Sequence, residues 1–358
     1  MKKQIFLILL FAWILVPQSF AVNGPDKEVL NAFELRTKGK VDDSRKLLES
    51  ILSKDSTNAM AHYEMARLKH YLLISGQAVK VEDILISINK AVTYDPKNIT
   101  YAYYKAIASF LNAYMAMETG NAEVKKRVDE TCLQFEKVLS MKPDYSEASL
   151  YLVEIYGMLP KDMGGDSLKA IAWSDKLATK NDYFGSKGKA ALLPRESDHM
   201  KFWMDRLDKK KENPEFLMEV GKAYLNKQDP QNAEKYFDLA IKADPSKNIL
   251  LLDLARYHIM VVMQNKDLAK TELPLAKACL ERYLKTFPEP IIPLKAYAMG
   301  LMSVTEMFLG NQPEADKWKD EATKLDKYFS RALGIPTILL FDSPDQISHH
   351  YFSFFTPF

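Results

Sequence analysis

Apolar residues recur at helical spacing along almost the whole chain, from Pro25 to about Leu333. No segment shows the sustained alternation of apolar and polar residues that marks a half-buried β-strand. Glycine, which weakens helices, is scarce at 13 of 358 residues. The pattern therefore predicts an all-α protein built from many amphipathic helices.

The clearest internal repeat is the 34-residue segment Pro214–Lys247. Small residues stand where two antiparallel helices would cross, aromatic residues where the pair would meet the next helix, and a proline where the second helix would stop. Counted from Pro214, positions 8, 11, 20, 24, 27 and 32 are Gly221, Tyr224, Ala233, Phe237, Ala240 and Pro245. One such pair cannot bury its apolar face alone, so we expect the units to stack.

This segment resembles the tetratricopeptide repeat (TPR) family at nearly every signature position. Leu217, at position 4, is the visible departure, because the family often has tryptophan there. The resemblance implies a right-handed superhelical solenoid of antiparallel helix hairpins. It also implies a role in holding proteins or peptides in the concave groove lined by the first helix of each hairpin, the A helix. It implies no reaction.

The same spacing of small, aromatic and proline residues recurs, less completely, on both sides of this segment. About eight units fit within residues 22–333, which we assign to the repeat array. The unit in residues 99–145 exceeds 34 residues, and we expect longer helices there because both of its segments are long and amphipathic. Residues 183–213 form a short and divergent unit.

The resemblance also predicts which side chains line the groove, at positions 5, 9, 12 and 13 of the A helices. Transferred to this sequence, these positions give Tyr63, Arg67, His70, Tyr71, Leu150, Glu154, Met218, Lys222, Leu225, Asn226 and Arg256. The mixture of aromatic, apolar and cationic groups suits an extended peptide. Lys222 and Asn226 resemble the family's clamp for a C-terminal carboxylate, but Met218 is not a clamp residue. The alternative is that these residues form an ordinary solvent-facing helix surface.

One loop raises the question of catalysis, because residues 159–170 read LPKDMGGDSLKA. A phosphate-binding loop needs a preceding strand and a Lys-Ser/Thr pair at the start of the next helix. Here a predicted helix precedes the glycines, and Lys169 falls inside the next one. We therefore interpret the segment as a lengthened hairpin turn with Asp166 or Ser167 as N-cap. The alternative is an anion site at the start of the second helix.

The first 21 residues have the pattern of a secretory signal peptide. Lys2 and Lys3 precede an apolar run of about a dozen residues, and small residues lie three and one before a cut after Ala21. The alternative is an uncleaved anchor, but the run is shorter than the ~20 residues a spanning helix needs. No cysteine follows the cut, so we expect a soluble, exported protein, periplasmic or extracellular in a bacterium, and not a lipoprotein.

Charge and composition exclude several classes of function. Without the signal peptide, 47 basic residues balance 47 acidic ones, which gives no support to a nucleic-acid partner. His62 and His70 share one helix face but lie about 12 Å apart, too far for one metal ion. No catalytic motif stands out, so we expect no enzyme, no metal site and no cofactor. We also expect no disulfide between Cys132 and Cys279, which fall in distant units.

The tail, residues 334–358, loses helical spacing and carries six aromatic residues in its last 18. Exposed, such a segment is an aggregation hazard. It is therefore interpreted as a cap over the last repeat, which solenoid ends require, and alternatively as a segment that docks a partner. The sequence as a whole favours a non-enzymatic exported scaffold that binds a protein or peptide. The alternative is an accessory protein that binds a small ligand between helices, for example beside a transporter.

Overall fold

Sixteen α-helices make up most of the computed structural model, which describes residues 24–194 and 196–328. The predicted signal peptide and the tail, residues 334–358, lie outside the described residues. No strand occurs within the described ranges. The helices are α2 (Gly24–Thr37), α3 (Val41–Lys54), α4 (Ala59–Ile74), α5 (Val81–Tyr94), α6 (Ile99–Glu118), α7 (Val124–Met141), α8 (Ser146–Met158), α9 (Ser167–Ala178), α10 (Asp182–Ala191), α11 (His199–Leu207), α12 (Pro214–Asn226), α13 (Pro230–Ala243), α14 (Leu250–Gln264), α15 (Ala269–Leu284), α16 (Ile292–Phe308) and α17 (Gln312–Leu325).

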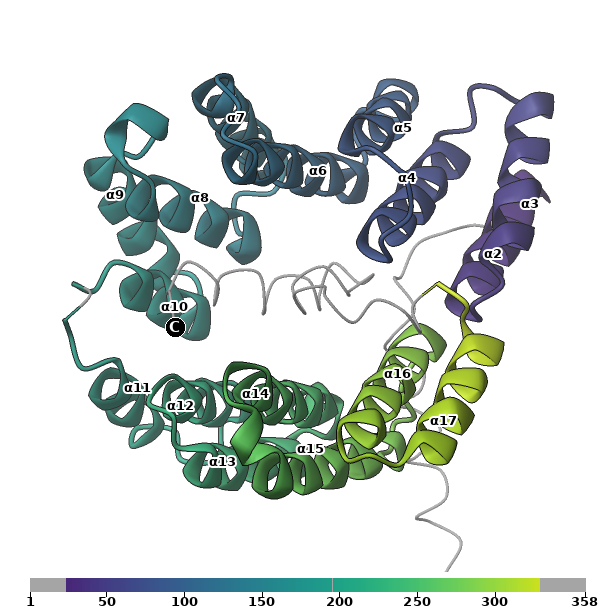
Figure 1. The fold of residues 1–358 in the computed structure, drawn as a ribbon. Coiled ribbons are helices and arrows are strands. Elements are labelled where there is room, and N and C mark those ends of the chain that lie inside the picture. Colours follow the sequence, from purple (N-terminus) through teal and green to yellow (C-terminus); the bar gives the residue numbers. More distant parts are fainter. Residues whose placement is uncertain (1–23, 195, 329–358) are drawn as a thin grey trace, which may run out of the picture.

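Consecutive helices pack as antiparallel hairpins, and the hairpins stack side by side. The even-numbered A helices lie on the inner side of the stack, and the odd-numbered B helices lie outside (Figure 1). The hydrophobic core runs continuously between neighbouring helices rather than gathering at one centre. The prediction of an all-α helical-hairpin solenoid is confirmed.

The helix starts repeat the same capping chemistry. Asn58, Asn98, Asn181 and Asn213 each accept a hydrogen bond from the backbone N–H three residues later, at the start of α4, α6, α10 and α12. Asp166, Asp198 and Asp229 do the same for the B helices α9, α11 and α13. Each cap satisfies a donor that the helix leaves open, so short polar side chains fix where these seven helices begin.

The unit Pro214–Lys247 has the close packing that its signature residues predict. Ala233, Phe237 and Ala240 are fully buried on α13. A Cβ atom on Gly221 would lie 2.4 Å from the Phe237 ring and 3.2 Å from the carbonyl oxygen of Ala233. Glycine is therefore required at this crossing.

Two units depart from the 34-residue form. Helices α6 and α7 have 20 and 18 residues, which confirms that the third unit is long through its helices. The fifth unit is divided between its neighbours, because α10 packs against α8 and α9 whereas α11 packs against α12. The divergence of residues 183–213 therefore marks a junction between two arcs of the stack, α2–α10 and α11–α17.

The two ends of the array meet, so that the stack closes into a ring (Figure 1). Residues that follow α17 reach the first turn of α3 and the inner face of α4. Cys132 on α7 and Cys279 on α15 lie on opposite arcs and are free, buried thiols. Burial raises the pKa of the Cys132 thiol to about 11 and that of Cys279 to about 12.

Candidate binding surface on the inner wall

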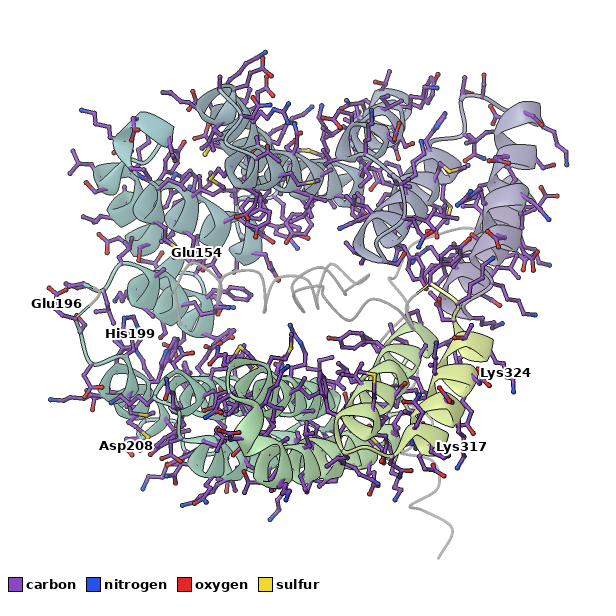
Figure 2. The ribbon with its side chains drawn as sticks, viewed as in Figure 1. Glu154, Glu196, His199, Asp208, Lys317 and Lys324 are labelled. Atoms are coloured by element: carbon purple, nitrogen blue, oxygen red, sulfur yellow. The ribbon has the colours of Figure 1, made fainter. Side chains whose placement is uncertain are left out.

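The inner wall is the side of the ring formed by the even-numbered helices α2 to α16 (Figure 2). Glu154 of α8 lies on this inward side, whereas Asp208, Lys317 and Lys324 lie on the outside. The A helices also carry several charged side chains that are buried, including Arg36, Glu64, Glu154, Glu219 and Glu306. Buried charge is costly unless it is paired, so each of these groups needs a structural or functional explanation.

Two arginines share one carboxylate where α2 meets α4. The Nε atom of Arg36, which is fully buried, lies 2.5 Å from Glu64 Oε1, and Arg67 Nη1 lies 3.4 Å from Glu64 Oε2. The Phe33 ring contacts both guanidinium groups, with centroid distances of 5.5 Å to Arg36 and 5.1 Å to Arg67. Aromatic faces attract such cations, so Phe33 and the Glu64 carboxylate together stabilise two neighbouring guanidinium groups where α2 meets α4.

His70 lies one helical turn further along α4. Its Nδ1 atom is 3.0 Å from the hydroxyl of Tyr104 on α6, and its Nε2 atom is buried without a hydrogen-bond partner among the described residues. Burial, with the charges of Arg36 and Arg67, lowers the pKa of His70 to about 4. The imidazole is therefore neutral at pH 7, and it acts as a hydrogen-bonding group rather than as a cation.

A second polar cluster joins α10 and α12. Glu219 accepts a hydrogen bond of 2.7 Å from the Tyr183 hydroxyl, and Lys187 and Lys222 lie 4.0 and 3.9 Å from the same carboxylate oxygen. Burial acts to raise the pKa of Glu219, but the two lysines outweigh it and lower the pKa below its usual value. Glu219 is therefore ionised and balances the positive charge of this cluster.

Glu154 is the exception among the carboxylates of the inner wall. It is 3% exposed, and its Oε2 atom has no hydrogen-bond partner within residues 24–194 and 196–328. Burial raises the pKa of Glu154 well above its usual value, and the negative charge of Glu219 adds to the effect while Lys187 opposes it. The carboxyl group is thus a polar group aimed inward that retains unused hydrogen-bonding capacity.

Replacing Glu154 with glutamine should make the stability less dependent on pH. Because its folded pKa is raised, the folded protein keeps a proton that the unfolded chain releases above about pH 4.5, so stability falls as pH rises to the folded pKa. Across that interval the Glu154→Gln variant should gain on the wild type by about 1.4 kcal/mol per pH unit. Urea unfolding at several pH values measures the difference. Equal pH profiles for variant and wild type would contradict the assignment.

The predicted groove residues divide into three groups. Leu150, Tyr71 and Met218 belong to the main hydrophobic core, and Tyr63 belongs to a second apolar cluster between α4, α5 and α6. Arg67, His70, Glu154 and Lys222 are polar members of the set that are buried or nearly so. Leu225 and Arg256 are partly exposed and Asn226 is exposed. Arg256 makes no ion pair or hydrogen bond with any described residue, so it is a cation available on α14.

Several inner-wall residues did not come from the groove positions, namely Phe33, Arg36, Glu64, Tyr183, Lys187 and Glu219. A signal for two of them exists in the repeat. Glu64 and Glu219 both stand at position 6 of their units, and Asp253 occupies the same position in the seventh unit. The recurrence of an acidic residue at position 6 of the A helix could have indicated an ion-pairing site there.

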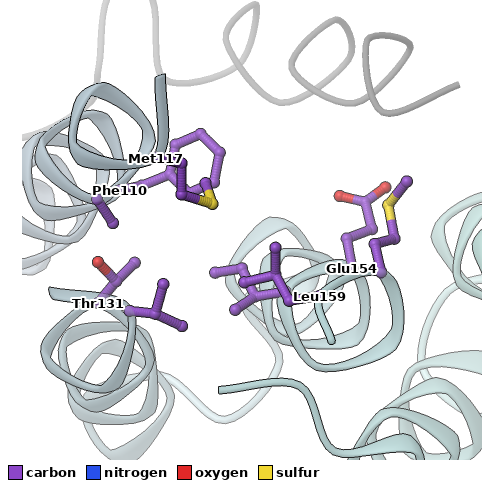
Figure 3. A pocket seen from close by; sticks show the side chains of 9 residues that line it. Phe110, Met117, Thr131, Glu154 and Leu159 are labelled. Atoms are coloured by element: carbon purple, nitrogen blue, oxygen red, sulfur yellow. The ribbon is translucent and has the colours of Figure 1, made fainter. Parts of the chain in front are cut away.

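A small apolar cavity lies between α6, α7 and α8 (Figure 3). Its lining includes Phe110, Met117 and Leu159, with Thr131 and Glu154 as the polar residues. In the close-up, the Glu154 carboxylate lies apart from Phe110 and Met117. The enclosed space holds about one water molecule, so a small organic ligand would need the helices to move apart.

No group of three or more histidine, cysteine or acidic residues arranged to hold a metal ion occurs in the described part of the chain. His62 uses its Nε2 atom to contact the carbonyl oxygen of Ser56 at 2.9 Å. Within the described ranges, no helix is long and apolar enough to cross a membrane.

Comparison with known proteins finds similar folds among solved structures. No family model and no curated protein matches the sequence. Yeast Tom70 matches over 90% of this chain and 65% of its own length, at 17% identity and a TM-score of 0.54. A thermophilic TPR protein from Thermus thermophilus matches over 66% of this chain and 100% of its own, at 15% identity and a TM-score of 0.41. A TPR protein from Parabacteroides merdae matches over 86% and 97%, at 15% identity and a TM-score of 0.35.

At these identities the likeness to Tom70 shows the fold alone. The chain has the fold of the TPR-like superfamily, which confirms the resemblance drawn from Pro214–Lys247.

Proposed function

We propose that this protein is an exported, non-enzymatic scaffold whose inner wall binds an extended segment of a partner protein. Proteins of this fold commonly act as interaction scaffolds, and that general role is supported by the structural neighbours. In this protein the partner lies along the A helices and not on the outer B helices. Export follows from the signal-peptide pattern of residues 1–21.

The proposal rests on buried polar side-chain atoms of the A helices that have no hydrogen-bond partner in the part of the chain that the structure describes. Glu154 Oε2, His70 Nε2 and the Tyr297 hydroxyl are buried without partners among the described residues. Such groups cost free energy unless something satisfies them. A polypeptide backbone supplies both donors and acceptors along its length, so an extended segment would satisfy these groups once the side chains that cover them move aside.

The test uses the affinity-tagged full-length chain and the envelope fraction of its native host, with mass spectrometry of the bound proteins. Arg256→Glu reverses a partly exposed charge on the A helix α14, and Lys270→Glu reverses an exposed charge on α15 of the same unit. We expect Arg256→Glu to lower recovery of the partner by at least about tenfold, as expected for a lost charged contact. Lys270→Glu should bind like the wild type. Equal recovery by both variants would place the partner elsewhere.

The second candidate is a periplasmic accessory protein that binds a small ligand between helices. The apolar cavity beside Glu154 favours it, because ligand pockets combine apolar walls with a few polar groups. Its size argues against it, since small-molecule sites usually enclose ~300–1,000 Å³. A small molecule that copurifies with the native protein, without a reproducible protein partner, would reverse the ranking.

A further inference from the structure

The closure of the ring depends on a small set of polar side chains. Asp42, in the first turn of α3, accepts hydrogen bonds from the ammonium group of Lys327 and, at 2.7 Å, from the Tyr328 hydroxyl. Tyr71 of α4 donates its hydroxyl hydrogen to the Asp326 carboxylate, which is 1% exposed. These contacts join residues that are more than 250 positions apart, and we call the five side chains the latch.

The latch differs from the other junctions of the ring. Most neighbouring helices of adjacent units, such as α3 and α4 or α15 and α16, pack against each other along the stack. Among the described residues, α17 has no comparable packing against α2, α3 or α4. The latch instead combines hydrogen bonds with an exposed ion pair, and exposed ion pairs contribute little to stability. Opening the latch therefore breaks the buried Tyr71–Asp326 hydrogen bond and the more exposed contacts of Asp42, but it does not separate two helices packed along their length.

A second feature of the closure is a close approach between backbones. Gly39 ends the turn between α2 and α3 with a φ of +74°, and a Cβ atom there would lie 2.2 Å from the carbonyl oxygen of Leu325. No side chain fits in that space. The closed ring therefore requires glycine at this position for a reason separate from its φ angle.

The place opposite the latch can act as a pivot. Helices α10 and α11 lie on the far side of the ring in Figure 1, where the two arcs meet. Side-chain pairs join the arcs there, including Lys210 with Asp182 at 2.6 Å and Arg206 Nε with the Ser186 hydroxyl at 3.2 Å. Helices α10 and α11 pack only slightly against each other, so the connection between them is where the chain can absorb a rotation.

We propose that the latch is a gate: the ring opens between α3 and α17, pivots near α10 and α11, and so admits a partner segment to the inner wall. The admission of a partner segment rests on the proposed function, whereas the opening of the ring does not. An internal segment of a folded partner can reach the enclosed inner wall only if the ring opens. Tyr71 links the two, since it belongs both to the latch and to the A helix α4. Contact on the inner face of α4 would thus reach the latch directly.

The test compares two glycine substitutions that strain the backbone equally. Gly39→Ala adds a methyl group against Leu325, whereas Gly76→Ala, in the corresponding turn of the next unit, has a φ of +76° and nothing within 4 Å. Spin labels at Glu49→Cys and Lys317→Cys, both exposed, report the distance across the latch by double electron–electron resonance. The native thiols are buried, so labelling is directed to the introduced sites.

We expect Gly39→Ala to lengthen the distance by more than about 5 Å, the scale of a one-turn displacement, and Gly76→Ala to keep the wild-type distance. Asp42→Asn, which removes the charge, serves as a second variant if Gly39→Ala does not fold, and it should add a longer-distance population. A wild-type distance in every folded latch variant would overturn the gate. The measurement needs no partner, so its outcome is independent of whether the inner wall binds one.

Discussion

Replacing Phe237 with alanine is expected to lower the free energy of unfolding by about 3–5 kcal/mol, the usual range for a buried phenylalanine. The ring is fully buried between α12 and α13, and it occupies the space that Gly221 leaves open. No neighbouring side chain can fill the gap, because Ala233 and Ala240 are the other buried residues on that face of α13. Urea unfolding followed by circular dichroism measures the loss.

The matched control is Leu239→Ala on the same helix. Leu239 is 41% exposed, so its removal should cost less than about 1 kcal/mol. Similar losses for the two variants would mean that the hairpin core of this unit is not packed around the Phe237 ring. Phe237→Ala should also destabilise the adjacent units, because each unit of a stack is stabilised by its interfaces with the units on either side.

The fold could be predicted because its determinants are local and repeated. Gly221 and Phe237 belong to one hairpin, and their spacing alone indicates a close crossing. The Asn and Asp caps act within three residues of their own position. Each repeat of about 34 residues contains the residues that pack within its own unit and against the next unit. These local contacts are sufficient to define a solenoid.

The closure of the ring could not be predicted in this way. Asp42 and Lys327 are 285 positions apart, and neither is distinguished in the sequence from other surface charges. Whether a solenoid closes depends on small rotations summed over all eight units, including the divided fifth one. No single residue pattern encodes that sum.

The same limit applies to the inner wall. Groove positions transferred from the family describe an open superhelix, in which side chains at position 5 face solvent. Leu150 and Met218, both at position 5, belong instead to the hydrophobic core between neighbouring helices and are 2% and 1% exposed. The acids at position 6, Glu64 and Glu219, pair with cations instead. Their role depends on Arg36 and Lys187, which come from the preceding A helices.

A substitution in the turn formed by residues 159–170 is also expected to lower stability strongly. Gly165→Ala is expected to lower the free energy of unfolding by about 3 kcal/mol, because the added Cβ atom would lie 1.7 Å from the carbonyl oxygen of Leu159. Backbone atoms cannot move aside as a flexible side chain can. Gly120→Ala, in the turn of the preceding unit, meets nothing within 4 Å and should cost about 1–2 kcal/mol from its positive φ alone.

The same variant separates a structural turn from an anion site. The N–H groups of Gly164, Gly165 and Asp166 donate to the carbonyl oxygens of Lys161, Pro160 and Tyr156, at 3.2, 3.0 and 2.8 Å. The Asp166 carboxylate accepts from the Lys169 N–H at 3.1 Å and so occupies the start of α9 with a negative charge. These backbone N–H groups are therefore not available to an anion, and the Asp166 carboxylate would repel one at the start of α9. Titration of the wild type with inorganic phosphate should therefore give no heat of binding, and binding that Gly165→Ala abolishes at unchanged stability would establish the anion site instead.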